Sequence, residues 1–311
     1  MRGDVVRILA LGEVMIELSA AGADAGPGLW RQGLAGDTFN TAYSLAALRP
    51  DWQIGYATRL GADAISDAAL ATIAAAGIRT DRITRDPDRS IGLYMISVTN
   101  GERSFSYWRG QSAARMMAED AGWLAESFDG ADVIYLSGVT LAILSPAARE
   151  RLFAALQGRD VVFDPNIRPR LWETPEVLRA TITRAASLSR IVLPSFDDEA
   201  AAFGDADPAA TARRYAAAGA QEVVVKNGNA ELAILSAGRM VAAPAPRAVR
   251  PTDTTGAGDS FNAGYLVARL NGADPASAVA AGQALAALVV QHPGALLPRS
   301  VLDTFAREAT G

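Results

Sequence analysis

Two glycines and an acid in the C-terminal third are the residues best placed to do chemistry. Gly256 and Gly258 stand at the start of a segment that reads as a helix, and Asp259 follows them directly. Backbone N–H groups at a helix N-terminus face outward beside the positive end of the helix dipole, which favours binding of an anion such as phosphate. An acid at the edge of that site could take a proton from a hydroxyl. Together these residues predict transfer of a phosphoryl group to a hydroxyl.

Two common glycine-loop motifs do not fit this segment. A Walker A loop needs Gly-Lys followed by Ser or Thr, and the chain has no Gly-Lys pair. A dinucleotide-binding fingerprint needs a third glycine three residues after Gly258, where Phe261 stands. The purely structural alternative is a glycine-rich turn that caps a helix packed through Phe261, Tyr265 and Ala268. A bare Gly-x-Gly-Asp would favour that alternative, but the longer string Asp253–Phe261 does not.

Composition excludes several classes of function. The 311 residues carry a net charge of −5, which argues against a nucleic-acid partner or an anionic membrane. Because there is no cysteine, disulfides, thiolate metal sites and cysteine nucleophiles are excluded. Lys226 is the only lysine and His292 the only histidine. The chain shows no signal-peptide pattern and no apolar run of about 20 residues, so we expect a cytoplasmic protein.

Short apolar runs alternate with alanine-rich helical stretches through the second half of the chain. The expected strands are 5–12, 133–137, 161–164, 191–194 and 222–226, and the expected helices are 146–157, 175–187 and 208–218. This alternation predicts an α/β fold with a mostly parallel central sheet flanked by helices.

Two further segments differ from this pattern. Residues 92–98 and 103–109 read as a β-hairpin with Asn100-Gly101 as its turn. Residues 14–18 could join the hairpin in a small separate sheet. Since these strands come from distant parts of the chain, we expect a single domain, 1–311, with a β-sheet lid formed by about 14–35 and 92–110.

Two motifs carry a family resemblance. Asp253-Thr-Thr-Gly-Ala-Gly-Asp-Ser-Phe261 resembles the C-terminal signature of the ribokinase-like (PfkB) carbohydrate kinases. Gly33-Leu-Ala-Gly-Asp-Thr-Phe-Asn-Thr-Ala42, followed by Leu60–Asp63 and Ala76–Asp81, is similar to the first signature region of that family. The resemblance spans essentially the whole chain. It implies a ribokinase-like fold and transfer of the γ-phosphoryl group of ATP to a sugar hydroxyl, with Mg²⁺.

Within the family the chain is similar to bacterial kinases of the sugar acid 2-dehydro-3-deoxygluconate (KDG). The matching segments are 12–18, 103–109, 135–145 and 164–172. This resemblance implies that the terminal hydroxyl of KDG is phosphorylated, giving 2-dehydro-3-deoxy-6-phosphogluconate. Fructokinases share a similar hairpin end and a similar Asp-Pro-Asn-x-Arg string, so a fructokinase or another PfkB sugar kinase stays an alternative. A non-catalytic sensor of sugar or nucleotide is disfavoured by the intact Gly256–Asp259.

The resemblance also implies roles for particular residues. Asp259 would be the base, kept ionised by the helix dipole, and the backbone of Gly256, Ala257 and Gly258 would form the anion hole. The residues expected at the sugar are Gly36, Asp37, Asn40, Tyr94, Tyr107, Arg109, Arg168 and Asp259. Those expected at the nucleotide are Asn166, Arg168, Ser195, Lys226, Asn227, Gly228, and Gly256, Ala257 and Gly258, the three called here the glycine loop.

Some of these roles have competing interpretations. Arg109 and Arg168 suit a carboxylate because the guanidinium is a planar, bidentate donor, although Arg168 could be a surface salt-bridge partner. Tyr94 and Tyr107 could instead pack the lid. Lys226 could meet a phosphate or end a strand at the surface.

The metal ligand is left open by the sequence. Mg²⁺ would arrive with ATP, held mainly by phosphates and water. Family members usually carry Asn-x-x-Glu near the phosphates, whereas this chain has Ser195-Phe-Asp-Asp198-Glu199. Asp198 or Glu199 could reach the metal through water, and a solvated loop is the alternative. An apolar lid could also pair across a homo-oligomer.

Overall fold

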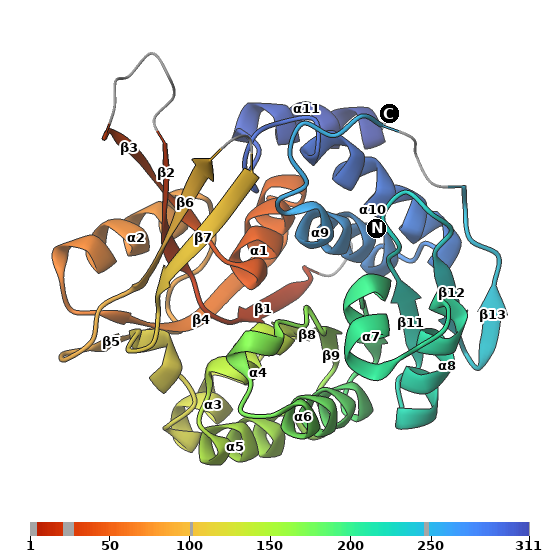
Figure 1. The fold of residues 1–311 in the computed structure, drawn as a ribbon, viewed down its shortest axis with the longest axis horizontal. Helices are drawn as coiled ribbons and strands as arrows, with labels where there is room; N and C mark the ends of the chain where they lie inside the picture. The colour runs from red at the N-terminus through yellow and green to blue at the C-terminus, as the bar shows by residue number, and fades with distance from the viewer. Residues whose placement is uncertain (1–4, 21–27, 100–101, 246–248, 311) are drawn as a thin grey trace.

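The computed structural model describes residues 5–20, 28–99, 102–245 and 249–310. A nine-stranded sheet crosses the molecule (Figure 1). Its strands in spatial order are β13 (Arg239–Val241), β12 (Ala233–Ser236), β11 (Glu222–Val225), β10 (Ile191–Val192), β9 (Val161–Asp164), β8 (Val133–Ser137), β1 (Arg7–Leu11), β4 (Gln53–Gly61) and β5 (Ile83–Asp86). From β11 to β5 neighbouring strands are parallel, and β12 and β13 add antiparallel pairs. The predicted parallel sheet is therefore present.

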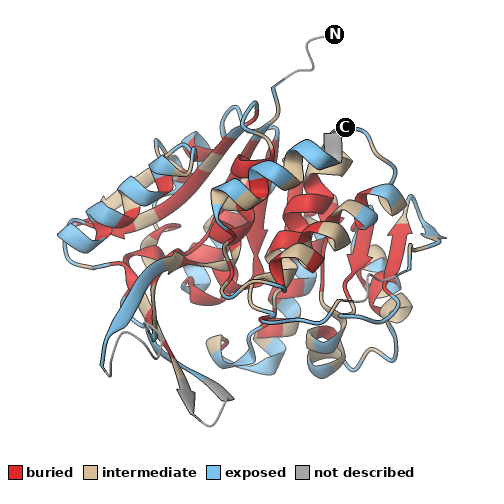
Figure 2. Cartoon of the chain, turned by 90° about the horizontal axis from the view of Figure 1, so that it is seen from above, coloured by how far each residue is buried: buried red, intermediate tan, exposed pale blue. Residues whose placement is uncertain are grey.

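Helices cover both faces of this sheet, and the strands between them are buried (Figure 2). One face carries α1 (Asp37–Leu48), α2 (Ala64–Ala75), α9 (Ala257–Leu270), α10 (Pro275–Val289) and α11 (Arg299–Thr310). The other carries α3 (Ala121–Phe128), α4 (Gly138–Ile143), α5 (Pro146–Leu156), α6 (Pro175–Ser187), α7 (Phe196–Phe203) and α8 (Pro208–Ala218). Two 3₁₀ turns, η2 (Ala113–Met116) and η3 (Pro169–Leu171), lie between elements. No helix within the described ranges is long and apolar enough to cross a bilayer.

Alternating side chains of one strand feed two separate hydrophobic cores. Ile8 and Ala10 of β1 belong to the core under α1 and α9, whereas Leu9 and Leu11 belong to the core on the opposite face. Successive side chains of a strand point to opposite faces, so a sheet covered on both sides needs apolar residues at every position. This explains why β1 reads as an unbroken apolar run.

The predicted helices begin where local capping signals stand. Ser145, Thr174 and Asp207 each accept a backbone N–H of the first turn, and a proline follows each of them at the first helical position. A side-chain cap followed by proline favours a helix start, because proline has no N–H to satisfy there. The predicted bounds 175–187 and 208–218 are confirmed, and 146–157 is confirmed to within one residue.

A second, four-stranded sheet stands beside the main one, called here the small sheet. Its order is β3 (Trp30–Ala35), β2 (Met15–Ala20), β6 (Gly92–Thr99) and β7 (Glu102–Trp108), with β2 and β6 parallel and the other pairs antiparallel. The expectation that residues near 14–18 join the 92–109 hairpin is confirmed. The predicted turn at Asn100-Gly101 lies outside the described residues.

Candidate active site

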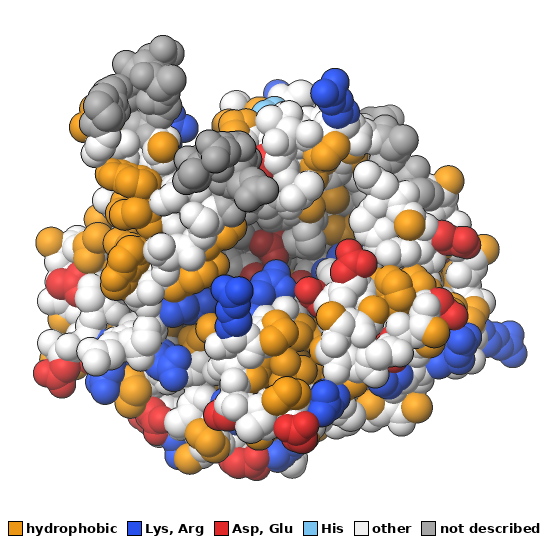
Figure 3. Space-filling view, in the orientation of Figure 1, with side chains coloured by type: hydrophobic (Ala, Val, Ile, Leu, Met, Phe, Trp, Pro, Cys, Tyr) orange, Lys and Arg blue, Asp and Glu red, His pale blue; other side chains and the backbone are white. Residues whose placement is uncertain are grey.

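A cleft of about 1030 Å³ opens between the small sheet and the main body. Its walls include Tyr94 and Tyr107 of the small sheet, strand-end residues Asp164 and Lys226, and the start of α9. Figure 3 shows this hollow with acidic side chains at its floor and basic side chains along its rim. Ligands of parallel sheets gather at the carboxyl ends of the strands, which is where this cleft lies.

Only glycine fits at position 256, the first residue of the glycine loop at the cleft. Gly256 has a φ of +74°, and a Cβ there would lie 2.8 Å from the backbone of Ala295. Both facts exclude other residues without a backbone shift. Buried Asp253 fixes the loop by accepting the N–H and hydroxyl of Thr255, at 3.0 and 2.7 Å, and the N–H of Gly294, at 2.7 Å.

One of the three backbone N–H groups predicted to bind the anion already has an acceptor within the protein. The N–H of Ala257 is donated to the carbonyl of Thr254 at 3.2 Å, in a turn that leads into α9. The N–H groups of Gly256 and Gly258 are the two other members of the expected set, and all three residues line the cleft.

Asp259 lies in the first turn of α9 and accepts a hydrogen bond from Asn40 Nδ2 at 2.7 Å. The pKa of Asp259 is raised to about 8, because burial and the charges of Asp37 and Asp164 together outweigh the hydrogen bond from Asn40, which lowers it. The expectation that the helix dipole keeps this acid ionised is therefore wrong for the structure. Desolvation and two nearby acids outweigh the roughly half charge at a helix end.

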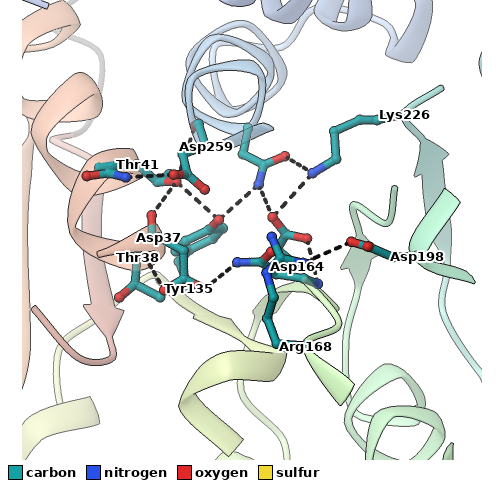
Figure 4. Close-up of polar contacts among 12 residues, drawn as sticks. Asp37, Thr38, Thr41, Tyr135, Asp164, Arg168, Asp198, Lys226 and Asp259 are labelled. Carbon is teal, nitrogen blue, oxygen red and sulfur yellow. Dashed lines mark hydrogen bonds and ion pairs between the residues drawn. The ribbon is translucent and has the colours of Figure 1, made fainter. Parts of the chain in front are cut away.

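A buried polar network lies beneath the glycine loop (Figure 4). Lys226 Nζ donates to Asp164 Oδ2 at 3.2 Å and to Asn262 Oδ1 at 3.0 Å. Asn262 Nδ2 in turn donates to Asp164 at 2.7 Å and to the hydroxyl of Tyr135 at 3.0 Å. A Cβ on Gly258 would lie 3.6 Å from Lys226 Nζ, so the ammonium sits beside the loop. Lys226 is 9% exposed, which excludes the surface-strand alternative.

Asn166 contacts two acids, Asp164 and Asp37. Its backbone N–H donates to Asp164 Oδ1 at 3.1 Å and its Nδ2 donates to Asp37 Oδ2 at 2.7 Å. Its φ of +33° is a left-handed conformation that asparagine tolerates better than most residues. Asn166 was expected at the nucleotide, yet its side chain contacts an acid expected at the sugar.

Arg109 is held by Glu13, an acid that lies in the matching segment 12–18 but has no role in the sequence interpretation. Its Nη2 donates to Glu13, and the hydroxyl of Ser112 donates to the same carboxylate. Glu13 is only 2% exposed. Within the part of the chain that the structure describes, Arg109 Nε is buried without a hydrogen-bond partner. The available signal for Glu13 is a lone acid inside an apolar run, between Gly12 and Val14.

The acidic cluster of α7 divides into two different environments. Arg168 Nη1 donates to Asp198 Oδ2 at 3.2 Å, and both residues line the cleft. Burial raises the pKa of Asp198, while Arg168 lowers it. Glu199 instead accepts from the hydroxyl of Tyr215 at 2.8 Å and from Arg214 at 2.7 Å, and burial raises its pKa to about 7. The suggestion that Glu199 could reach the metal is therefore corrected. Glu199 is fully buried in an internal ion pair and does not line the cleft.

Aromatic side chains of the small sheet face the cleft. The hydroxyl of Tyr94 donates to Glu17, and its ring centroid lies 5.7 Å from that of Tyr107. Tyr94 is 7% exposed and Tyr107 is 54% exposed. Both line the cleft, with Phe105 stacked beside Tyr107.

The remaining predicted residues fall into two groups. Gly36, Asp37, Asn40 and Ser195 line the cleft. Asn227 and Gly228 are absent from its described lining: Asn227 Nδ2 donates to the carbonyl of Glu231 at 2.9 Å, and Gly228 sits in a turn with a φ of +52°. Among the described residues no three His, Cys, Asp or Glu side chains are grouped as a metal site.

The fold and the cleft define a carbohydrate kinase. The model of the pfkB family carbohydrate kinases matches residues 6–301, so the chain belongs to that family. The ribokinase-like α/β fold predicted from the sequence is confirmed.

Known relatives give finer comparisons. The chain is 39% identical over 304 residues to the 2-dehydro-3-deoxygluconokinase of Dickeya dadantii (strain 3937), covering 94% of this chain and 96% of that protein. The crystal structure of a PfkB protein from Polaromonas sp. JS666 superposes with a TM-score of 0.80 at 31% identity, covering 96% and 99% of the two chains. A fructokinase from Xylella fastidiosa, solved with bound ATP, has a TM-score of 0.75 at 25% identity and covers 98% and 99%.

Proposed function

We propose that this chain is an ATP-dependent sugar-acid kinase that phosphorylates the terminal hydroxyl of 2-dehydro-3-deoxy-D-gluconate. The observation that carries the proposal is one cleft that holds both Asp259 beside the glycine loop and Arg109, whose guanidinium has N–H donors beyond the one paired with Glu13. The first pair suits phosphoryl transfer, and the arginine suits a carboxylate. The relative from Dickeya dadantii supports the same substrate.

Asp259 would act as the base that takes the proton of the attacking hydroxyl. A base works best when its pKa lies near the working pH, and a positioned base contributes roughly 10²–10⁴-fold. The raised pKa of about 8 makes Asp259 a stronger proton acceptor than an ordinary carboxylate. Asn40 orients the carboxylate through its 2.7 Å hydrogen bond.

The transferring phosphoryl group would lie against the glycine loop. Backbone N–H groups of Gly256 and Gly258, with Ala257 between them, would stabilise the charge that develops there. The ammonium of Lys226 beside Gly258 adds a fixed positive charge at the same place. Because this ammonium is already held by Asp164 and Asn262, little motion is needed to use it.

Mg²⁺ is expected to accompany ATP. The donors present fit a metal that keeps phosphate and water ligands, because Asp198 and Asp164 line the cleft without forming a protein cage. Asp198 would reach the water shell of the metal, which when bound neutralises phosphate charge.

The sugar acid would be held from two sides. Arg109 and Arg168 would bind its carboxylate, since both line the cleft from different walls. Asp37, Asn40 and the backbone of Gly36 would contact its hydroxyls, and Tyr94 and Tyr107 would cover it. The small sheet would then act as a lid, formed by about 14–35 and 92–110 on a single domain.

The ligands proposed are small molecules, a sugar acid and ATP. The enzyme is proposed to be cytoplasmic. The net charge of −5 gives no support for nucleic-acid binding. A homo-oligomer through the small sheet is proposed because Trp30 and Trp108 on that sheet are 41% and 58% exposed.

The test is a coupled assay of ADP release with KDG, its galactose-derived epimer and fructose as acceptors. A site that hydrogen-bonds a carboxylate rejects an analogue that lacks it, so kcat/KM for KDG should exceed that for fructose by about 10²-fold or more. Equal or greater activity on fructose would favour the fructokinase alternative. Sugar binding without ADP release would favour a sensor.

A further inference from the structure

We propose that Glu13 is a positioning residue for the acceptor site: it fixes the guanidinium of Arg109 so that the remaining N–H donors serve the substrate carboxylate. The inference rests on the proposed sugar-acid kinase function and assigns a role to a residue that the sequence analysis left without one. Glu13 would not touch the reacting atoms and would act only through Arg109.

Close packing leaves Glu13 little freedom. It lies in the connection from β1 to β2, where the main sheet gives way to the small sheet. A Cβ on Gly92 would lie 2.9 Å from Glu13 Oε1, and a Cβ on Gly36 would lie 2.3 Å from the Glu13 carbonyl oxygen. Glycine at both places lets the backbone approach from two directions, and Ser112 adds a hydrogen bond to the carboxylate. The carboxylate is thus confined to one place.

The charge of Glu13 needs a partner, and Arg109 is that partner. A buried carboxylate is strongly unfavourable unless it is paired and hydrogen-bonded. The pair is largely shielded, with 1% of the Glu13 side chain and 12% of the Arg109 side chain exposed. In such surroundings the guanidinium cannot turn away without leaving Glu13 unpaired.

Arg109 keeps donors for a second anion after pairing with Glu13. A guanidinium has five N–H donors in one plane. Glu13 engages Nη2, while Nε is buried and, over the described ranges, has no acceptor. Nε itself has no surface open to the cleft, so a ligand oxygen would meet the exposed part of the guanidinium, where 12% of the side chain is exposed at the cleft wall.

The contact also joins both ends of the small sheet. Glu13 lies two residues before β2, and Arg109 and Ser112 follow β7. One carboxylate therefore ties the chain that enters the small sheet to the chain that leaves it. Movement of β7 would carry Arg109 only as far as this contact allows, which keeps the guanidinium at the cleft.

A double-mutant cycle tests the inference. Glu13→Gln should lower kcat/KM for KDG about tenfold, mainly through KM for the sugar, with KM for ATP changed by less than about twofold. In an Arg109→Ala background the same Glu13→Gln change should alter kcat/KM by less than about twofold, because nothing remains to be positioned. Equal losses in both backgrounds would overturn the proposal, since a merely structural role is additive.

A matched control and a substitute variant complete the cycle. Glu17→Gln changes the acid of β2 itself, which contacts Tyr94 rather than Arg109, so its effect should add to that of Arg109→Ala. If thermal melting shows that Glu13→Gln does not fold, Glu13→Asp replaces it, because aspartate keeps the charge but withdraws it from Arg109. KDG turnover by the unmodified enzyme is measured first. Its absence would overturn the proposed function and this inference together, whereas additive losses overturn the inference alone.

Discussion

At the residue scale, burial and opposing charges set the pKa of Asp259. Asp37 and Asp164 raise the pKa of its carboxyl, while the hydrogen bond from Asn40 and the ammonium of Lys226 lower it. Burial exceeds each of these and leaves a pKa of about 8. The ionised carboxylate therefore costs folding free energy, and for the same reason it is a strong proton acceptor.

Asp259→Asn should abolish turnover while leaving ATP and sugar affinity within a few-fold of the original. The change keeps the size of the side chain and its acceptor for Asn40 and removes only the capacity to take a proton. The loss in kcat should be roughly 10²–10⁴-fold, measured by coupled assay with dissociation constants by calorimetry. Retention of more than about a tenth of the rate would contradict a base role.

The same variant should be stabilised in a pH-dependent way. The carboxyl ionises near pH 4 in the unfolded chain and near pH 8 in the folded one. The folded state therefore binds the extra proton between these values, so the wild type loses stability as pH rises from about 4 to about 8. Asp259→Asn lacks this loss, and its melting temperature should exceed that of the wild type by about 2 °C or more at pH 8. Calorimetric scans at pH 5 and 8 check this; an equal difference at both would refute it.

Replacement of either cleft arginine by lysine should damage activity although the charge is kept. Arg109→Lys or Arg168→Lys removes the fork that binds a carboxylate through two N–H groups. A missing partner for a partly buried carboxylate costs about 1–3 kcal/mol, so kcat/KM for KDG should fall at least about tenfold. Activity on fructose should barely change. Parallel losses on both sugars would mean that these arginines serve ATP or the small sheet instead.

At the scale of elements, the small sheet is the part suited to move. It is built from two segments distant in sequence, and β3 and β7 are its edge strands. Its cleft face carries Tyr94, Phe105 and Tyr107, of which the last two are 44% and 54% exposed. Closure of the sheet on a sugar would bury this aromatic surface.

We expect hydrogen exchange in residues 92–109 to slow when KDG is added. Closure would bury the hairpin and exclude water that would otherwise hydrolyse ATP. Peptides from β9 and α6, which lie in the main body, serve as an internal control and should exchange at the same rate with and without sugar. Equal protection of the hairpin in both conditions would show that the small sheet does not close.

Local patterns predict some elements and miss others. Strands β8 and β9 have the predicted bounds because unbroken apolar runs mark strands buried on both faces. Strand β4 lies next to β1 but is not predicted, because Gly55 and Arg59 interrupt its apolar run. The site contacts are harder still: Glu13 and Arg109 are 96 positions apart, and Asp37 and Asn166 are 129 apart. Only the fold brings such pairs together. The glycine loop can be predicted from the sequence because its residues are consecutive.

At the scale of the whole molecule, the outer face of the small sheet is the surface expected to bind a second copy. Trp30 and Trp108 project from the face opposite to Tyr107, since side chains alternate along each strand. Large exposed aromatic side chains are typical of interface centres.

Trp108→Glu should therefore shift the protein toward a smaller species in sedimentation analysis. A charge in the middle of an apolar interface opposes association through desolvation. Met240→Glu is the matched control, because Met240 is a similarly exposed apolar side chain, 46% exposed, on β13 at the far end of the main sheet. A wild type that sediments as a monomer at micromolar concentration would refute the assignment.

The position of Lys226 has a practical consequence for handling the protein. It is the chain's only lysine, and its amine lies in the cleft against Asp164. Reagents that couple through amines, such as succinimidyl esters used for dyes, biotin or solid supports, would find only the α-amino group and this one side chain. Conjugation at Lys226 would occupy the glycine loop and inactivate the enzyme, and nucleotide would slow it. Coupling at Lys226 thus becomes an assay of cleft occupancy, and an amine for surface attachment other than the α-amino group requires an introduced lysine.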